Sequence, residues 1–504
     1  MRGELAVLAI VAIPAGAVGQ SCDLVPSFDM GLSPTRTVYV SPSGSNASGN
    51  GTAGSPYGTI AFAAAQATPG TAVVLLPGTY PGGTFLTNLA GTAAAPIWIG
   101  GAPGQARPVI EGGGEGLHLV RPRYIVVHDL EVRNVTANGI NADDGGDYAN
   151  AEAARFLTIR RVHVRDVGGT GNQDGIKLSG VRDVVVVDCE IERCGGANAG
   201  SGVDMVGCHR GLIARTTFRD MSGNAVQCKG GSDDIEVRWC RMIEAGQRAV
   251  NMGGSTGLEF FRPPLSSTEA NFEARDVRVV SNLIIGSQAP LAFVGCVDCL
   301  AANNTIITPH NWILRILQET VTQPPYTFIP CSGGRFVNNL VYFRRSDLSS
   351  YVNTGANTAP GTFAFDGNFW FAFDNPGASA PALPVPQTNG VSGLDPLFFD
   401  PQGNFALRPS SPARGRASSP LAATGDLAGV CYALPASVGA FEVCRANCDG
   451  SSTPPVLTAN DFQCFLNTFA ASSPDANCDG STSPPILTAN DFQCFLNKFA
   501  TGCP

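Results

Sequence analysis

Short apolar runs alternate with polar positions along most of the chain. From about residue 37 to residue 442, runs rich in Val, Ile and Leu return about every 22 to 40 residues and are separated by Gly, Asn and Asp. Five of these runs align with one another: Gly139–Ala142, Gly175–Gly180, Gly202–Gly207, Ala225–Gly230 and Ala249–Gly254. Within each run the residues alternate between two faces, as they do in a β-strand. The pattern therefore predicts a stack of short strands.

The alignment assigns each position of these runs to the inside or the outside of the stack. One inward row is Ile176, Val203, Val226 and Val250, and a second is Leu178, Met205, Cys228 and Met252. The outward row between them is Asn141, Lys177, Asp204, Gln227 and Asn251, continued through Ala292 to Arg315. Adjacent strands lie about 4.8 Å apart, so we expect Lys177 and Asp204 to be neighbours.

A second set of apolar runs carries small polar residues at one aligned position. These residues are Cys189, Thr217, Cys240, Asn282, Asn304 and Asn339. An Asn side chain repeated at one turn can hydrogen-bond from coil to coil, with Cys or Thr as small substitutes. Repeats of this length with two or three short strands each predict a parallel β-helix solenoid. A doubly wound α/β fold would need helical patterns of about 10 to 15 residues between its strands, and the sequence has none.

One helix is expected near the start of the solenoid, at residues 59–67. Thr59 is a suitable N-cap, the segment is rich in Ala, and Pro69 follows its end. A solenoid needs a cap on its exposed first edge, and we expect this helix to supply it.

The first part of this segment resembles a known group of secreted proteins. Thr37–Gly44, followed by Thr59–Ile60 and Leu76–Tyr80, is similar to the opening of right-handed parallel β-helix proteins, among them pectate lyases, alginate and chondroitin lyases and uronan epimerases. The likeness covers about residues 37–442. It implies an all-β domain, which we place at residues 21–443, and an activity on an acidic polysaccharide.

Residues 1–20 have the features of a signal peptide. Arg2 supplies the positive region, Leu5–Ile13 the apolar region and Ala15–Ala17 the small residues of a cleavage site. Beyond them no apolar stretch reaches the roughly 18 residues that a membrane-spanning helix needs. We therefore expect a secreted or cell-surface protein without a membrane span, in a compartment where its 16 cysteines can form disulfides.

The last part of the chain, residues 444–504, is a separate domain built on an internal repeat. Asn447–Gly450 recurs as Asn477–Gly480, and Leu457–Asn467 recurs unchanged from residue 487 to residue 497. Six of the cysteines fall in these 61 residues, whereas the other ten are scattered and are expected to be core residues. Six cysteines allow 15 connectivities. The shared spacing favours Cys448 with Cys464 and Cys478 with Cys494, which leaves Cys444 and Cys503.

The repeat also carries the first half of a calcium-binding loop. Asp475, Asn477 and Asp479 precede Gly480 at the required spacing, and Asp491 supplies a late acidic group at the start of a helix. Together these features resemble dockerin repeats, especially the cysteine-bearing modules of planctomycete-type secreted proteins. The resemblance implies Ca²⁺ at these four residues and a cohesin-like partner. Arg445 stands where the first repeat should have an acidic ligand, and an insertion lengthens the loop, so a disulfide-held repeat without metal is the alternative.

Charge argues against a nucleic-acid partner and draws attention to one face of the solenoid. Lys and Arg number 32 against 41 Asp and Glu, a net charge of −9, whereas nucleic-acid binders carry a basic face. Only 14% of the residues are charged. Several of them nevertheless gather on the outward face of the aligned strands: Asp174, Lys177, Asp204, Lys229 and Arg248.

This charged group fits the needs of uronate cleavage by β-elimination. The reaction needs a cation that neutralises the uronate carboxylate and a base that removes the C5 proton. Gln173–Lys177, followed by Gly202–Asp204, is similar to the calcium-and-lysine site of one pectate lyase family. By that resemblance Lys177 is the base, and Asp174 and Asp204 are Ca²⁺ ligands. The acidic pair expected before the second strand is replaced by Gly200–Ser201.

A second resemblance gives the catalytic roles to different residues. In the alginate and chondroitin lyases a Lys on one coil is followed by an Arg on the next, places that Lys229 and Arg248 approach. Gln227, Asn251, Arg315 and Trp312 are the expected substrate-binding residues. The alternatives are a non-catalytic glycan-binding or scaffold protein, an epimerase, a hydrolase that uses Asp174 and Asp204, or a plain ladder of salt bridges. We expect the protein to act as a monomer.

Overall fold

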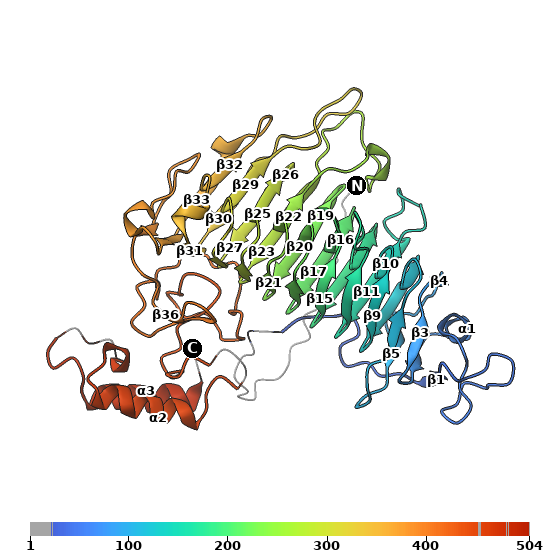
Figure 1. Ribbon diagram of the computed structural model, residues 1–504, viewed down its shortest axis with the longest axis horizontal. Coiled ribbons are helices and arrows are strands. Elements are labelled where there is room, and N and C mark those ends of the chain that lie inside the picture. Colours follow the sequence, from blue (N-terminus) through green and yellow to red (C-terminus); the bar gives the residue numbers. More distant parts are fainter. Residues whose placement is uncertain (1–21, 23, 452–454, 480, 482, 503–504) are drawn as a thin grey trace, which may run out of the picture.

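The computed structural model describes residues 22, 24–451, 455–479, 481 and 483–502. Between residues 36 and 392 the chain winds into a long solenoid whose coils stack along one axis (Figure 1). Each full coil gives one strand to each of three sheets, and every strand pairs in parallel with its equivalent on the next coil. The predicted parallel β-helix is confirmed. The predicted signal peptide lies outside the described residues.

Three parallel sheets form the walls of the solenoid. The ten-stranded sheet consists of β4 (Thr84–Thr87), β7 (Leu117–Val120), β10 (Ile140–Asp143), β13 (Ile176–Ser179), β16 (Ser201–Val206), β19 (Asn224–Lys229), β22 (Arg248–Gly253), β25 (Ala289–Val294), β29 (Leu314–Leu317) and β32 (Val352–Thr354). The thirteen-stranded sheet consists of β1 (Arg36–Val40), β2 (Thr71–Leu75), β5 (Ile97–Gly101), β8 (Arg123–His128), β11 (Ala154–Arg160), β14 (Val181–Val187), β17 (His209–Ala214), β20 (Ser232–Arg238), β23 (Ala274–Val280), β26 (Cys296–Val297), β27 (Leu300–Ala302), β30 (Arg335–Val337) and β33 (Ala364–Asp366). The twelve-stranded sheet consists of β3 (Thr79–Pro81), β6 (Val109–Glu111), β9 (Glu131–Val135), β12 (His163–Val167), β15 (Glu190–Cys194), β18 (Thr217–Arg219), β21 (Arg241–Ile243), β24 (Leu283–Ile285), β28 (Thr305–Ile307), β31 (Leu340–Phe343), β34 (Phe369–Ala372) and β35 (Val391–Ser392).

The remaining elements lie at the two ends of the solenoid or in its loops. After the last coil come an antiparallel pair, β36 (Phe398–Asp400) and β37 (Asn404–Leu407), and two helices, α2 (Ala459–Ala470) and α3 (Ala489–Thr501). Short 3₁₀ turns occupy Leu258–Phe260, Arg345–Asp347, Pro360–Thr362, Pro376–Ala378 and Pro474–Ala476. No helix among the described residues is long and apolar enough to cross a membrane.

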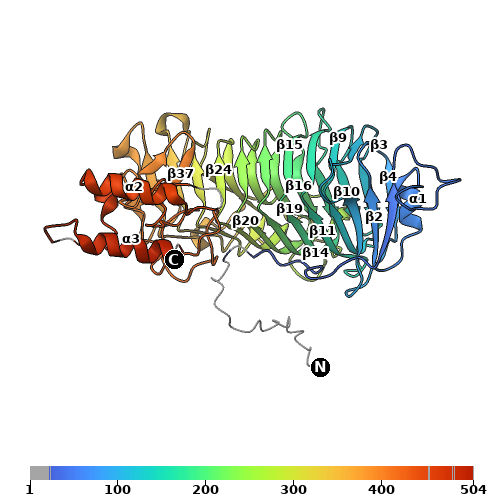
Figure 2. The same cartoon turned by 90° about the horizontal axis from the view of Figure 1, so that it is seen from below.

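The predicted N-terminal helix is present as α1 (Ile60–Ala65). The Thr59 hydroxyl accepts a hydrogen bond from the backbone N–H of Phe62, which confirms Thr59 as the N-cap. The helix buries Ile60, Ala63 and Ala64 against β1, β2 and β4. It therefore covers the first coil, at the opposite end of the molecule from α2 and α3 (Figure 2).

The predicted register of the solenoid core is confirmed. Ile176 pairs with Val203, Val203 with Val226, and Val226 with Val250. The second inward row follows in the same register, from Leu178 through Met205 and Cys228 to Met252. All eight side chains are 0% exposed. A slip of the strand pairing by one residue would turn these apolar side chains outward.

A ladder of buried Asn side chains runs along one corner. The backbone N–H groups of Asn282 and Asn304 donate to the Oδ1 atoms of Asn304 and Asn339 at 3.0 Å, and Asn339 donates in the same way to Asn368. The ladder predicted at this turn is confirmed for Asn282, Asn304 and Asn339, and it extends to Asn368. The prediction for Thr217 is wrong by one residue.

Thr216, not Thr217, continues this ladder toward the N-terminus. Its hydroxyl accepts a hydrogen bond from the Cys189 N–H at 3.4 Å, and the side chain is fully buried. Thr217 instead begins β18, where it pairs with Glu190. The residue before each ladder position adopts a left-handed conformation, and in this coil that residue is Arg215, with φ +45°.

The N-terminal segment at residues 24–32 crosses the outside of the thirteen-stranded sheet. The sequence pattern does not reveal this contact. A disulfide joins Cys22 to Cys431, so two of the scattered cysteines are not simple core residues. Eight others, from Cys189 to Cys331, are unpaired and buried as expected. Asp29 accepts a hydrogen bond from Arg160 at 2.6 Å, which fastens the segment to β11. Phe28 and Leu32 pack against a cluster that contains Trp98 and Val126, so the segment covers apolar surface of that sheet.

The C-terminal repeat has a small core of its own. Disulfides join Cys448 to Cys464 and Cys478 to Cys494, as the spacing predicts. The rings of Phe465 and Phe495, at equivalent places of the two repeats, stack at 4.2 Å. Val443 packs in the last core of the solenoid domain and Cys444 in the core of the repeat. Cys503, the remaining predicted partner of Cys444, lies outside the described residues.

We predict that Val226→Ala destabilises the solenoid by about 1–3 kcal/mol. The Val226 side chain is 0% exposed between Val203 and Val250, and the rigid coils cannot collapse around the lost methyl groups. Urea unfolding followed by tryptophan fluorescence measures this loss. Arg193→Ala, at an exposed ion pair, is the matched control and should change the free energy of unfolding little. Equal stability of the Val226 variant and the native chain would contradict the register.

Candidate functional site

The predicted outward row lies on the ten-stranded sheet in the expected order. Asn141 pairs with Lys177, Lys177 with Asp204, and Asp204 with Gln227. The row continues through Asn251 and Ala292 to Arg315. These residues lie on consecutive strands of the ten-stranded sheet, from β10 through β13, β16, β19, β22 and β25 to β29, so they follow one another one coil apart along one face of the solenoid.

Lys177 lies at the centre of a compact charged cluster on this face. Its ammonium contacts a carboxylate oxygen of Asp204 and lies 3.2 Å from Oδ2 of Asp174. The Lys229 ammonium lies 4.0 Å from the same oxygen of Asp204. The side chains of Lys177 and Lys229 are 22% and 14% exposed, whereas those of Asp174 and Asp204 are 3% exposed. The two lysines thus face solvent and the two carboxylates lie beneath them.

Burial and charge set the protonation of this cluster. Burial, together with the charge of Asp204, raises the pKa of Asp174 to about 6. Burial also acts to raise the pKa of Asp204, but Lys177 and Lys229 hold it below its ordinary value. Burial acts to lower the pKa of Lys177, but the charges of Asp204 and Asp174 outweigh it and raise this pKa above its ordinary value. Lys177 is therefore a fixed cation at neutral pH.

An open cleft of about 690 Å³ lies above this cluster. Lys177, Ser179 and Lys229 form part of its floor, and loops at residues 143–148 and 255–262 form its walls. Pockets of about 300–1,000 Å³ are typical of small-molecule and sugar sites. Asp174 and Asp204 are not among the lining residues, which makes them poor candidates for the acid and base of a hydrolase.

The other predicted residues lie on later coils of the same face. The Arg248 guanidinium is 2.5 Å from Oε1 of Glu319 and donates to Oδ1 of Asn251 at 3.3 Å. The Arg315 guanidinium lies over the Trp312 ring at 4.4 Å from its centroid. Gln227, whose Oε1 accepts from the amide of Asn224 at 3.3 Å, completes the set. These five residues are not among the described residues that line the 690 Å³ cleft.

The sequence pattern missed a second charged group on the same row. His118, one coil before Asn141, lies between Glu115 and Asp143, with its ring nitrogens 2.8 Å and 2.6 Å from their carboxylate oxygens. Burial acts against the charged form, but the two carboxylates raise the pKa of His118 to about 9. Asp143 also lines the cleft. The run Gly116–Val120 has the same in–out alternation as the five aligned runs, and including it would have placed His118 on this row.

The cleft residues fit a resident calcium ion poorly. Ca²⁺ takes six to eight oxygen ligands. Of the two predicted ligands, Asp174 already accepts from the Ser201 N–H at 2.7 Å and from Lys177. Of the four carboxylate oxygens of Asp174 and Asp204, only Oδ1 of Asp204 is buried without a hydrogen-bond partner among the described residues. Lys177 therefore supplies the positive charge that an ion would bring.

Both C-terminal loops present an uncommitted oxygen atom toward a possible ion. Oδ1 of Asn447 and Oδ1 of Asn477 are buried without hydrogen-bond partners among the described residues. In the second repeat, Asp491 is 0% exposed and one of its oxygens accepts from the Asp479 N–H at 3.1 Å. Asp461 has the same burial and the equivalent contact in the first repeat. The second oxygen of Asp461 and of Asp491 caps a helix by accepting from the N–H of Thr458 or Thr488, so the amide oxygens of Asn447 and Asn477 are the uncommitted oxygen ligands of the kind that Ca²⁺ takes.

The residue at the first loop position makes contacts outside its own loop in both repeats. Oδ1 of Asp475 accepts from the Ser410 N–H at 3.2 Å, and Arg408 lies 3.7 Å from the second oxygen. Asp475 thus contacts the end of the solenoid domain. Arg445 donates to the backbone oxygens of Asn477 and Cys478, and so joins the first repeat to the second.

Comparisons with known proteins agree with this architecture. The family model described as "Right handed beta helix region" matches residues 115–306. Among solved structures, the chain is similar to pectate lyase Pel9A, with 16% identity and a TM-score of 0.53 over 82% of this chain and 97% of that one. An alginate lyase from Paenibacillus sp. str. FPU-7 gives 15% identity and a TM-score of 0.41 over 65% of this chain and 99% of that one. No curated protein sequence matches the chain.

These findings define the chain as a right-handed parallel β-helix with a small disulfide-bonded helical region at its C-terminus. At 16% identity the likeness to the pectate lyase shows the fold alone. The residues of the cleft must carry the argument about function.

We predict that the full-length chain binds Ca²⁺ through its C-terminal loops, with up to two ions per chain. Titration calorimetry under oxidising conditions measures the stoichiometry, and the melting temperature should rise with calcium because the metal binds only the folded loops. Asp461→Ala and Asp491→Ala should each remove one ion. Asp347→Ala, at an exposed turn of the solenoid, is the control. Equal melting with calcium and with chelator would leave only the disulfide scaffold.

Proposed function

We propose that the protein is an exported enzyme that binds an acidic polysaccharide along the cleft and cleaves it by β-elimination. The observation that carries the proposal is the pair of ammonium groups, Lys177 and Lys229, that line one cleft and share one buried carboxylate, Asp204. Two cations in an open polar groove suit a chain that bears a carboxylate on each sugar. Repeated coils about 4.8 Å apart also suit a repeating ligand.

The two lysines would have different roles. Lys177 is held between two carboxylates and carries a raised pKa, so it is suited to binding the uronate carboxylate and poorly suited to accepting a proton. Lys229 has only the longer contact to Asp204 and is the better candidate for the base. In its neutral form Lys229 would take the C5 proton. The electron pair would then form the C4–C5 double bond as the C4–O bond breaks, and the departing oxygen would take a proton from solvent.

The C-terminal repeat would attach the enzyme to a larger assembly. Its two equivalent helices, its disulfides and its calcium-type loops are the features on which the dockerin resemblance depends. A cohesin-like protein is the partner that this resemblance suggests. The signal peptide predicted at residues 1–20 and the disulfide between Cys22 and Cys431 suit an extracellular site of action.

We predict that Lys229→Ala lowers kcat on a susceptible polyuronate by about a hundred-fold or more, the usual effect of losing a positioned base. Release of unsaturated uronates, measured by ultraviolet absorbance, gives the rate. Lys177→Met should instead raise KM, because it removes the cation that binds the substrate carboxylate. A chelator should leave the rate unchanged, since the cleft carboxylates are committed to Lys177.

Folding of the Lys177 variant needs a control, because it leaves Asp204 buried without its cation. The double variant Lys177→Met with Asp204→Asn removes the charge imbalance and should restore stability without restoring KM. If Lys229→Ala keeps nearly full activity while Lys177→Met lowers kcat, the roles are reversed. A rate that depends on added calcium would contradict the assignment of Lys177 as the resident cation.

A second candidate function is passive binding of a glycan. It is favoured by one observation: Lys177, Asp174 and Asp204 satisfy one another's charges, as a structural ion cluster does. The same assay separates the two functions. If the protein binds polyuronates but releases no unsaturated product from any of them, the result would support binding alone.

A further inference from the structure

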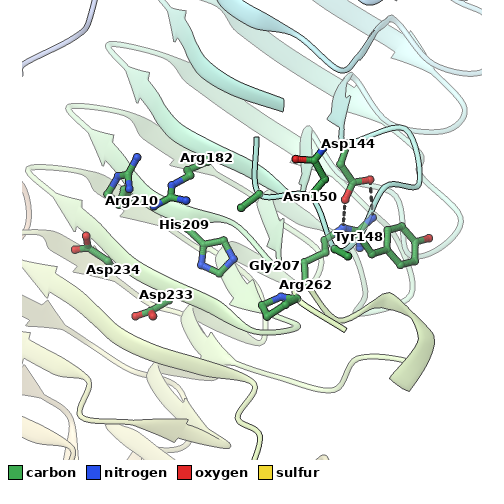
Figure 3. A pocket seen from close by; sticks show the side chains of 14 residues that line it. Asp144, Tyr148, Asn150, Arg182, Gly207, His209, Arg210, Asp233, Asp234 and Arg262 are labelled. Atoms are coloured by element: carbon green, nitrogen blue, oxygen red, sulfur yellow. Dashed lines mark hydrogen bonds and ion pairs between the residues drawn. The ribbon is translucent and has the colours of Figure 1, made fainter. Parts of the chain in front are cut away.

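A second cavity lies around the corner of the solenoid from the cleft. It has a volume of about 360 Å³ and lies at the starts of β14, β17 and β20 of the thirteen-stranded sheet (Figure 3). Asp144, Tyr148 and Arg262 line both this cavity and the cleft. The two cavities are therefore adjacent, with this group of three side chains between them.

The dividing group is a rigid clamp between two loops. Nε of Arg262 donates to Oδ2 of Asp144 at 2.6 Å, and both side chains are 9% exposed or less. The guanidinium lies 4.0 Å from the centroid of the Tyr148 ring. These residues belong to insertions that interrupt the regular coils, and they are 118 positions apart in the sequence. The cavity is thus a built feature and not a gap in the solenoid.

Two glycines at the corner of the solenoid allow the clamp to lie this close. Gly180 and Gly207 have φ values of +65° and +60°. A Cβ at Gly180 would lie 2.3 Å from Oδ2 of Asp144, and a Cβ at Gly207 would lie 2.3 Å from Cβ of Arg262. Any larger residue would push the clamp away from the coils.

The floor of the cavity consists of side chains from three successive coils. Arg182 pairs with His209, and His209 with Asp233, so these residues lie one coil apart on rigid strands. Figure 3 shows His209 between two arginines, Arg182 and Arg210, and two aspartates, Asp233 and Asp234. Polar groups held on strands can recognise a ligand with defined geometry.

The charges that line the cavity are largely neutralised by pairing. Arginine and aspartate partners are in contact in three pairs: Arg210 with Asp183, Arg262 with Asp144, and Arg275 with Asp233. In contrast, Lys177 and Lys229 present their ammonium groups to the neighbouring cleft. An anion would therefore prefer the cleft, and the second cavity has no excess of positive charge to attract one.

The cavity retains groups that can bind hydroxyls in both directions. Burial lowers the pKa of His209, so its imidazole is neutral at neutral pH; one ring nitrogen donates to the backbone of Arg262 and the other remains as an acceptor. Nε of Arg182 is buried without a hydrogen-bond partner among the described residues. Asp234, which is exposed, adds a carboxylate acceptor. A lining whose charges are largely paired and that offers both donors and acceptors matches the hydroxyl groups of a neutral sugar.

We propose that this cavity binds a neutral sugar side branch of the acidic polysaccharide whose backbone lies in the cleft. The inference rests on the proposed function, because it needs the backbone in the cleft. The cavity volume suits one or two sugar units. The clamp of Asp144, Tyr148 and Arg262 lies where the branch would leave the backbone. The protein would thus select branched acidic polysaccharides over linear ones.

The test compares a uronan that carries galactose or arabinose side chains with the same uronan after enzymatic debranching. Arg182→Ala should raise KM for the branched polymer about tenfold and leave KM for the debranched polymer within about twofold. Asp234→Ala is a second variant of an exposed lining residue and should act in the same direction. Arg193→Ala, an exposed arginine on β15 of another sheet, is the control and should change neither value.

Equal changes for the two polymers, or no change for either, would overturn the inference. If the wild-type protein cleaves neither polymer, the proposed enzymatic function fails, and a direct binding measurement still tests the cavity. Saturation-transfer NMR with the methyl glycosides of galactose and arabinose is that measurement, made on the full-length chain. Transfer that Arg182→Ala abolishes supports a neutral-sugar site, whereas no transfer, or equal transfer in both proteins, rejects it.

Discussion

Parallel hydrogen bonding between successive coils is the constraint on which the rest of the structure depends. Each strand of the ten-stranded sheet pairs with its equivalent one coil later, so an outward residue is always next to the outward residue at the same place. Inward rows such as Val203, Val226 and Val250 lock that register, because a shift by one residue would turn apolar side chains into solvent. The Asn ladder adds a second lock at one corner.

This register explains why charges gather at the cleft in a chain that has few of them. A buried carboxylate is costly unless it is paired. Asp204 is placed directly beside Lys177 by strand pairing, and Lys229 approaches it from the next coil. The aspartates hold the lysines in place from beneath, and both lysines line the cleft. Irregular loops around residues 143–150 and 255–263 then form walls of the cleft on this face and of the second cavity around the corner, and the two cavities differ in charge.

Features with a two-residue period could be predicted from the sequence, and features that depend on distant contacts could not. The pairing of Lys177 with Asp204 followed from alternation within Gly175–Gly180 and Gly202–Gly207. Thr216 and Thr217 are chemically identical, and no glycine marks the left-handed turn before them, so the pattern placed that row one residue too late. The contact of Asp144 with Arg262 joins residues that share no local motif. The same holds for the disulfide between Cys22 and Cys431.

The most direct test of the account is a crystal structure of the Lys229→Ala variant with a bound oligouronate. The account predicts that the sugar chain lies along the ten-stranded sheet, with one carboxylate within about 3 Å of the Lys177 ammonium, the usual length of a charge-assisted hydrogen bond. The C5 hydrogen of that sugar should point toward the place of the missing Lys229 side chain. An oligosaccharide bound on another sheet, or with its carboxylates turned away from Lys177, would contradict the account.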